Sequence, residues 1–253
     1  MAAVEKPLKT GDLEVLGVRV DRVDAQQALN SINSFLDTPG CKQVVTLNPE
    51  YVMQADRDPV LKGLINKSEL VVADGMGIVW ASRLLGKPLK GRVTGTGLLP
   101  EIGRLCAARE TGLFLLGGQP GIAELTAMKL REQIEGLEIA GVSCNDPGKA
   151  TDTRTIEMIN ESGAGVLAVA YGCPKQDYWI NRTRERLTGV RVAIGVGGAF
   201  DFISEQTPRA PRIFRRAGLE WLFRLWLEPA RARRMVVLPK FGLRVLGSRL
   251  KKK

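Results

Sequence analysis

The stretch LVVADGMGIVWASRLLG, residues 70–86, has the pattern of a strand followed by a helix. It begins with a short apolar run, passes through a turn that contains glycine, and continues as a segment typical of a helix. Three further runs along the chain, LFLL, VLAVA and VRVAIGV, are similarly apolar. Runs of this kind are expected of strands that are covered on both faces in a parallel sheet.

The same alternation continues along most of the chain. Strands are predicted at residues 14–20, 43–47, 70–73, 113–116, 137–142, 166–170 and 190–195. Helices are predicted at residues 25–36, 58–66, 76–85, 97–109, 120–134, 152–162 and 175–187. We therefore expect an α/β fold with an open, doubly wound, mainly parallel (Rossmann-like) sheet, whose ligand site lies beyond the carboxyl ends of the strands.

The amino-acid composition excludes several kinds of catalytic site. The chain has 253 residues, 44% of them hydrophobic, which is enough for a sizeable core. It has no histidine, which excludes Ser-His-Asp and Cys-His nucleophile systems and histidine-ligated zinc. Catalysis must then use carboxylates, Lys, Tyr, Thr or Cys. The four cysteines are far apart and indicate reduced thiols in a cytoplasmic protein rather than a disulfide framework: Cys41, Cys106, Cys144 and Cys173.

The positive charge is concentrated in the last part of the chain. The formal net charge is +10, yet residues 207–253 carry 14 Lys and Arg against two acids, which leaves 23 basic and 25 acidic residues for residues 1–206. We expect a Rossmann-like core over 1–206 and a basic, mostly helical, membrane-associating appendage over 207–253. Neither a signal peptide nor a run of about 18 apolar residues is apparent, so no membrane span is expected.

Small and polar residues follow five of the predicted strands. The segments are TLNPE (46–50), ADGMG (73–77), LGGQPG (116–121), YGCPKQ (171–176) and GVGGAFD (195–201). Helix N-termini at such turns favour anions, so the pattern indicates a nucleotide or nucleotide-sugar site. The alternative is that the glycines only make tight turns between strand and helix.

Asp74 directly follows an apolar strand. It could cap the next helix, or it could take a proton from an incoming hydroxyl where histidine is absent. Arg92, Thr94 and Gly95 in GRVTGTG offer a cation and backbone donors for phosphate, although a surface arginine is the common alternative. A GxGxxG fingerprint and a DxD pair are both missing, which disfavours a nicotinamide-dependent oxidoreductase and gives no indication of a metal or other cofactor.

Six motifs in unbroken order resemble the WecG/TagA/CpsF family of bacterial glycosyltransferases, also called glycosyltransferase family 26. They are TLNPEYVMQADRDP, VVADGMGIVWASRLLGKPLKGRVTGTGLLPEI, LFLLGGQPG, YGCPKQDYWI, GVGGAFDFIS and RAPRIFRRAGLEWLFRLWLEPARARR, and the similarity covers about residues 10–238. The resemblance implies a metal-independent inverting transferase of cell-surface polysaccharide or wall polymer synthesis. It would move an N-acetylmannosamine-type sugar from UDP to an undecaprenyl-diphosphate-linked acceptor.

The resemblance also assigns roles. It places the catalytic base on Asp74, an active-site threonine on Thr46, and sugar-nucleotide contacts on Asn48, Arg92 and Gln176. Further substrate-binding residues expected at the strand ends are Thr94, Gly95, Gly118, Tyr171, Gly172, Pro174, Gly197, Gly198 and Asp201.

Two positions depart from the family pattern. Asp177 stands where the PKQE motif has glutamate, a shortening that should matter little unless its carboxylate makes a specific contact. Glu205 stands where glycine is usual, which puts the geometry of that loop in question.

The basic tail contains GLEWLFRLWLEPARARRMVVL, residues 218–238, a helix-like stretch rich in Trp, Leu and Arg. It is typical of an interfacial membrane helix, and the alternative is a helix that docks its apolar face on the core. The family resemblance places diphosphate-binding arginines on Arg224, Arg231 and Arg234, and Arg209 and Arg212 are expected to act with them on the acceptor or the membrane.

The expected location is the inner face of the plasma membrane, with an anionic membrane surface as a partner and a homo-oligomer as a possibility. A nucleotide- or nucleic-acid-binding protein without transferase activity is the alternative, although the tail lacks a nucleic-acid motif and its Trp and Leu content favours lipid.

Overall fold

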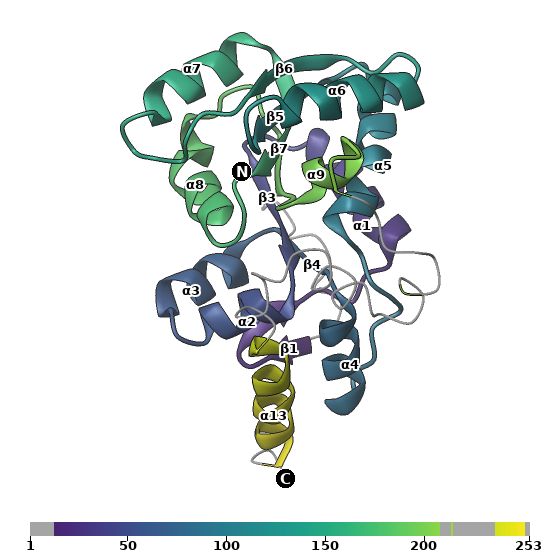
Figure 1. Cartoon of the computed structure of the whole chain (residues 1–253), viewed down its shortest axis with the longest axis vertical. Helices are drawn as coiled ribbons and strands as arrows, with labels where there is room; N and C mark the ends of the chain where they lie inside the picture. Colours follow the sequence, from purple (N-terminus) through teal and green to yellow (C-terminus); the bar gives the residue numbers. More distant parts are fainter. Residues whose placement is uncertain (1–12, 208–213, 215–235, 251–253) are drawn as a thin grey trace, which may run out of the picture.

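A computed structural model describes residues 13–207, 214 and 236–250. It confirms the predicted α/β fold (Figure 1). The main sheet has six strands in the order β4-β3-β8-β7-β5-β6, and every neighbouring pair is parallel. Its strands are β3 (Lys42–Leu47), β4 (Leu70–Ala73), β5 (Gly112–Gly117), β6 (Ile139–Ser143), β7 (Ala164–Ala170) and β8 (Val192–Gly195).

Helices connect these strands and cover both faces of the sheet. They are α1 (Ala25–Leu36), α2 (Pro49–Ala55), α3 (Pro59–Lys67), α4 (Met76–Leu84), α5 (Gly95–Ala108), α6 (Ile122–Gln133), α7 (Asp152–Glu161), α8 (Lys175–Thr183), the 3-10 helix η1 (Arg184–Arg186), α9 (Ala199–Ile203) and α13 (Val237–Leu250).

One predicted strand is wrong. Residues 14–20 form a hairpin of β1 (Leu13–Val15) and β2 (Val18–Val20), which pair antiparallel in a separate two-stranded sheet. The turn residues Leu16 and Gly17 have φ values of 54° and 80°, a conformation that glycine adopts at little cost.

Helix α2 was not predicted. It begins directly after β3, where the Asn48 side chain accepts a hydrogen bond from the Tyr51 N–H and Pro49 occupies the first turn. These are the residue types that favour a helix start. The predicted helix at 175–187 ends at Thr183 and continues only as η1.

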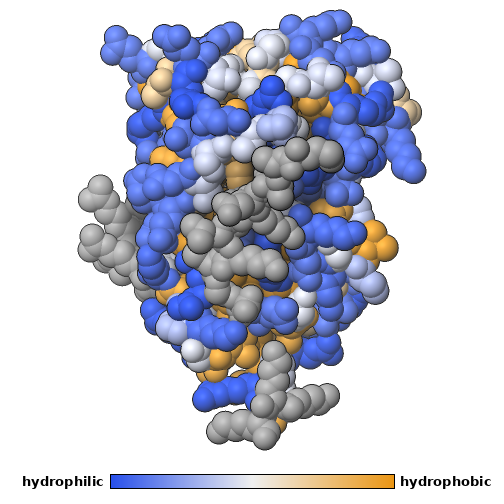
Figure 2. All heavy atoms as spheres, turned by 180° about the vertical axis from the view of Figure 1, so that it is seen from behind, coloured by the Kyte–Doolittle hydropathy of each residue, from blue (hydrophilic) through white to orange (hydrophobic). Residues whose placement is uncertain are grey.

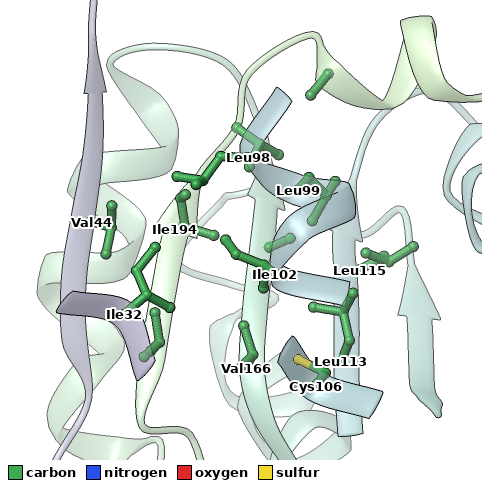
Figure 3. Packing of buried hydrophobic residues seen from close by; sticks show 14 of the residues in the cluster. Ile32, Val44, Leu98, Leu99, Ile102, Cys106, Leu113, Leu115, Val166 and Ile194 are labelled. Carbon is green, nitrogen blue, oxygen red and sulfur yellow. The ribbon is translucent and has the colours of Figure 1, made fainter. Parts of the chain in front are cut away.

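Two helical layers enclose the sheet. Helices α1, α5, α6 and α9 pack on one face, and α2, α3, α7 and α8 pack on the other. Figure 3 shows apolar side chains of α1 and α5 facing those of the strands. Ile32 and Ile102 are fully buried there against Val44 and Ile194, and each buried side chain of this size contributes about 1.5–3 kcal/mol. Because neighbouring β3 and β8 are followed by helices on opposite faces, a crevice opens beyond their carboxyl ends.

Helix α13 lies at the opposite end of the molecule from α6 and α7 (Figure 1). It packs against α2 and α4, and its Phe241 and Val245 are 4% and 1% exposed. Arg244 forms an ion pair with Asp56, which follows α2. Apolar side chains also gather on the surface near this end (Figure 2).

Most of the predicted appendage lies outside the described residues. Only residues 236–238 of the 218–238 stretch are described. The five expected tail arginines all lie outside the described residues: Arg209, Arg212, Arg224, Arg231 and Arg234. The boundary at residue 206 therefore stays a prediction. Within the described ranges, none of the helices combines the length and the hydropathy that a membrane crossing requires.

Candidate active site

A pocket of about 470 Å³ lies beyond the carboxyl ends of β3, β4, β7 and β8, as the topology of an open parallel sheet predicts. The structure brings eight of the predicted site residues together in its lining: Thr46, Asn48, Asp74, Arg92, Thr94, Gln176, Gly197 and Gly198.

Asp74 directly follows β4 and is held from two sides. Its N–H donates to the Leu47 carbonyl of the neighbouring strand (2.7 Å), and its Oδ2 accepts a hydrogen bond from the Gly95 N–H (3.3 Å). Asp74 does not occupy the N-cap position of the next helix, because the N-cap of α4 is Gly75. The carboxylate instead lies at the N-terminus of α5, where the helix dipole favours a negative charge.

The absence of a side chain at Gly95 lets the first turn of α5 lie close to the end of β8. A Cβ atom on Gly95 would lie 3.1 Å from the Val196 carbonyl oxygen, so a larger residue would separate α5 from the end of β8. Thr94 caps α5 by accepting a hydrogen bond from the Gly97 N–H (3.0 Å). The Val93 N–H donates to the Ala73 carbonyl (2.9 Å), which holds the partly buried Arg92 beside the strand end. The GRVTGTG motif therefore builds one wall of the pocket.

Thr46 and Asn48 come from the end of β3, and both side chains hold the pocket walls together. The Thr46 hydroxyl donates to the Gly195 carbonyl (2.8 Å), which joins β3 to β8. The Asn48 Oδ1 accepts from the Tyr51 N–H (2.9 Å) and starts α2. Thr46 Oγ can still accept a hydrogen bond from a ligand, and the Asn48 amide can still donate one.

Gln176 is fixed in the floor of the pocket. Its Oε1 accepts a hydrogen bond from the Gly197 N–H (3.0 Å), and its side chain is almost fully buried. A Cβ atom on Gly195 would lie only 2.3 Å from Gln176 Nε2. Glycine at position 195 is therefore required for this side chain to reach the loop after β8.

Six predicted binding residues are not among the described residues that line the pocket: Gly95, Gly118, Tyr171, Gly172, Pro174 and Asp201. The Gly95 N–H donates a hydrogen bond to the Asp74 side chain, and Asp201 lies in α9. Gly118 follows β5, which β8 and β7 separate from β3, and Tyr171 is the first residue after β7. Tyr171 packs edge-on against Trp179, with ring centroids 5.9 Å apart, and burial raises the pKa of its hydroxyl.

Sequence reasoning missed the apolar wall of the pocket. Helices α4 and α13, together with α9, supply Met76, Trp80, Ala81, Leu84, Phe202, Leu238, Phe241 and Val245. Trp80 is 44% exposed, so its indole is accessible at the rim. The spacing of Phe241 and Val245, one helical turn apart, was the available signal for α13 as a docked helix. Glu50, Thr96 and Cys173 also line the pocket and were not singled out as site residues.

Across the described part of the chain, no group of three or more Cys, Asp or Glu side chains is arranged to hold a metal ion. Independence of metal stays a prediction.

Comparisons with known proteins agree on one family. The model of the glycosyl transferase WecG/TagA/CpsF family matches residues 13–253. A Bacillus spizizenii protein named N-acetylglucosaminyldiphosphoundecaprenol N-acetyl-beta-D-mannosaminyltransferase is 34% identical over 234 residues, which cover 90% of this chain and 89% of the relative. A Staphylococcus aureus protein with the same name is 30% identical over 251 residues, which cover 98% of this chain and 97% of the relative.

Proposed function

The chain belongs to the WecG/TagA/CpsF family of glycosyl transferases, and from this premise we propose that it transfers an N-acetylmannosamine-type sugar from UDP to a polyprenyl-diphosphate-linked N-acetylglucosamine. The observation that carries the proposal is the position of Asp74. Its carboxylate lines a pocket at the sheet edge and is held against the first turn of α5 by the Gly95 N–H.

In the proposed reaction, Asp74 is the general base. The acceptor hydroxyl gives its proton to the Asp74 carboxylate while its oxygen bonds to the anomeric carbon of the donor sugar. The bond from that carbon to the diphosphate oxygen breaks, UDP leaves with the electron pair, and the configuration at the anomeric carbon inverts. Because Asp74 is held by both Leu47 and Gly95, the base needs little reorganisation as the proton moves.

The polar wall is suited to the charge that develops on the departing diphosphate. Arg92 lines the pocket, and the N-terminus of α4 at Gly75 and Met76 opens toward it. A guanidinium and a helix N-terminus stabilise phosphate oxygens, and in the proposed mechanism they do so without a metal ion. The tail arginines, Arg224, Arg231 and Arg234 among them, are proposed to hold the diphosphate of the acceptor.

The apolar wall supports an acceptor that carries a lipid chain. Trp80, Leu84 and Phe241 face the same pocket as Asp74 and Arg92. An amphipathic substrate can place its sugar and diphosphate against the polar wall and its first prenyl unit against α4 and α13. With such a substrate, the enzyme would act as a peripheral protein at the inner face of the plasma membrane.

The test measures UDP release and sugar transfer to a short-chain polyprenyl-diphosphate-linked N-acetylglucosamine. Asp74→Asn is expected to lower kcat by about 100-fold or more, the usual contribution of a general base. Glu50→Gln is the matched control, because Glu50 is the other carboxylate in the described lining, and it should keep kcat within severalfold of wild type. Near-normal turnover by a folded Asp74→Asn variant would exclude Asp74 as the base. Full activity is expected in excess EDTA.

A further inference from the structure

A cluster of buried polar side chains lies beneath the pocket. It consists of Asp177 in the first turn of α8, Gln43 in β3 and Tyr51 in α2, and all three are 0% exposed. A buried carboxylate that is not part of a close ion pair is rare in a protein core. Its presence at this place therefore requires an explanation.

The hydrogen bonds within this buried cluster are incomplete. Gln43 Nε2 donates to Asp177 Oδ1 and to the Asp177 carbonyl, both at 3.4 Å. Burial raises the pKa of Asp177 to about 6, and the nearby Tyr51 hydroxyl and Gln43 amide oppose this rise only in part. The Tyr51 hydroxyl is close enough to act on the charge of the carboxylate without reaching the geometry of a full hydrogen bond. Among the described residues, Tyr51 Oη, Asp177 Oδ2 and Gln43 Oε1 complete no hydrogen bond. An apolar or neutral side chain in place of Asp177 would avoid these penalties.

Each member of the buried cluster is linked to a pocket residue. The Tyr51 N–H holds the Asn48 side chain (2.9 Å), and Gln43 lies on the strand that ends at Thr46. Asp177 directly follows Gln176, whose Oε1 is bonded to the Gly197 N–H (3.0 Å). A shift of α8 relative to α2 and β3 would therefore change how Gln176 and Asn48 face each other across the pocket.

We propose that Asp177 is a positioning residue for the transfer reaction: its buried carboxylate joins α8 to Gln43 of β3, faces the Tyr51 hydroxyl of α2, and so fixes the mutual geometry of Asn48 and Gln176 in the pocket. Asp177 is fully buried and does not touch the substrate, so it acts through these neighbours. The proposal rests on the proposed transferase activity.

Turnover distinguishes a positioning role of Asp177 from a role in stabilising the fold alone. Asparagine has the same shape as aspartate and carries no charge to desolvate, so Asp177→Asn should leave the fold as stable as wild type or more stable at neutral pH. If Asp177 only served the fold, this variant would turn over normally. If it positions the pocket, turnover should fall although the fold is intact.

The experiment compares kcat, the KM for the UDP-sugar, and the melting temperature of four variants with wild type. Asp177→Asn is expected to lower kcat by about 10- to 100-fold, the effect of a displaced site, without a lower melting temperature. Asp177→Glu keeps the carboxylate and should restore most of kcat. Tyr51→Phe removes only the hydroxyl beside Asp177 and should lower kcat in the same direction, again without loss of stability.

Asp152→Asn is the matched control. Asp152 is a buried carboxylate that accepts from Trp179 Nε1 (2.9 Å) and Arg182 Nε (2.7 Å) and does not line the pocket. Its loss should lower the melting temperature and leave kcat within about twofold of wild type.

Normal kcat and KM in a folded Asp177→Asn variant would overturn the proposal, as would an Asp152→Asn variant that slows turnover equally. If Asp177→Asn does not fold, Tyr51→Phe decides, and normal turnover by that variant is then the overturning result. Failure of the proposed function itself is a separate result, because wild type would then transfer no sugar at all.

Discussion

The docking of α13 can be tested through Phe241. Phe241 and Val245 are the two residues of this helix that are buried in the core, and together they contribute about 3–6 kcal/mol to its attachment. Phe241→Ala removes about 3–5 kcal/mol, including the cavity left behind. The exposed ion pair between Arg244 and Asp56 adds only about 0–1 kcal/mol. The substitution therefore removes most of the free energy that holds α13 on α2 and α4.

Hydrogen exchange of the α13 amides is the direct assay. We expect residues 237–250 to exchange much faster in Phe241→Ala than in wild type, whereas the strands of the main sheet keep their protection. Because α13 lines the pocket, the KM for a short-chain lipid-linked acceptor should rise. Leu243→Ala is the control, since Leu243 lies on the same helix but is 70% exposed. Unchanged exchange in α13, or equal effects of both substitutions, would refute this account of the helix.

Two further predictions concern stability. Glu205 adopts φ 62°, a left-handed conformation that glycine tolerates better than glutamate, so Glu205→Gly should raise the free energy of unfolding by about 1 kcal/mol. The melting temperature should rise by roughly 2–4 °C. As the control, Glu157→Gly on the exposed face of α7 should lower both quantities. Burial raises the pKa of Asp177 from 3.8 to about 6, so the folded state binds more protons than the unfolded state between these pH values, and this contribution to stability is lost as pH rises through that window. The free energy of unfolding, measured with a chemical denaturant from pH 4 to pH 7, should therefore rise in Asp177→Asn relative to wild type, by up to about 3 kcal/mol at pH 7. A difference between variant and wild type that stays constant with pH would contradict the raised pKa.

The sequence predicted the elements whose patterns are local and long enough to recognise. Helix α1 has the predicted bounds because Asp24 caps it through the Gln27 N–H and its apolar residues repeat at helical spacing. Helix α2 is only seven residues long and directly follows β3, so no helical period could be recognised. In the hairpin at 13–20, the alternation continues through the turn, and only Gly17 marks the break.

The polar wall of the pocket was predictable because parallel strands end at one edge of the sheet. The order of the strands was not, and it decides which loops reach the pocket. Strand β5 lies at a distance from β3 and β4, so Gly118 is not in the lining although its loop resembles the others. The apolar wall joins Trp80 to Phe241, and contacts between residues so far apart in sequence depend on tertiary packing that no local pattern reveals.

The choice of base in the proposed mechanism can be narrowed by position alone. Within the described lining, the side chains that could serve as a base are the carboxylates of Asp74 and Glu50 and the thiol of Cys173. The Cys173 thiol points its weak donor at Gln54 Oε1, 3.8 Å away. Glu50 lies in the first turn of α2. Asp74 is tied to both a neighbouring strand and a helix N-terminus, through Leu47 and Gly95. A base must be held in place to act on a bound hydroxyl, and this geometry is why Asp74→Asn, with Glu50→Gln beside it, is the decisive pair of variants.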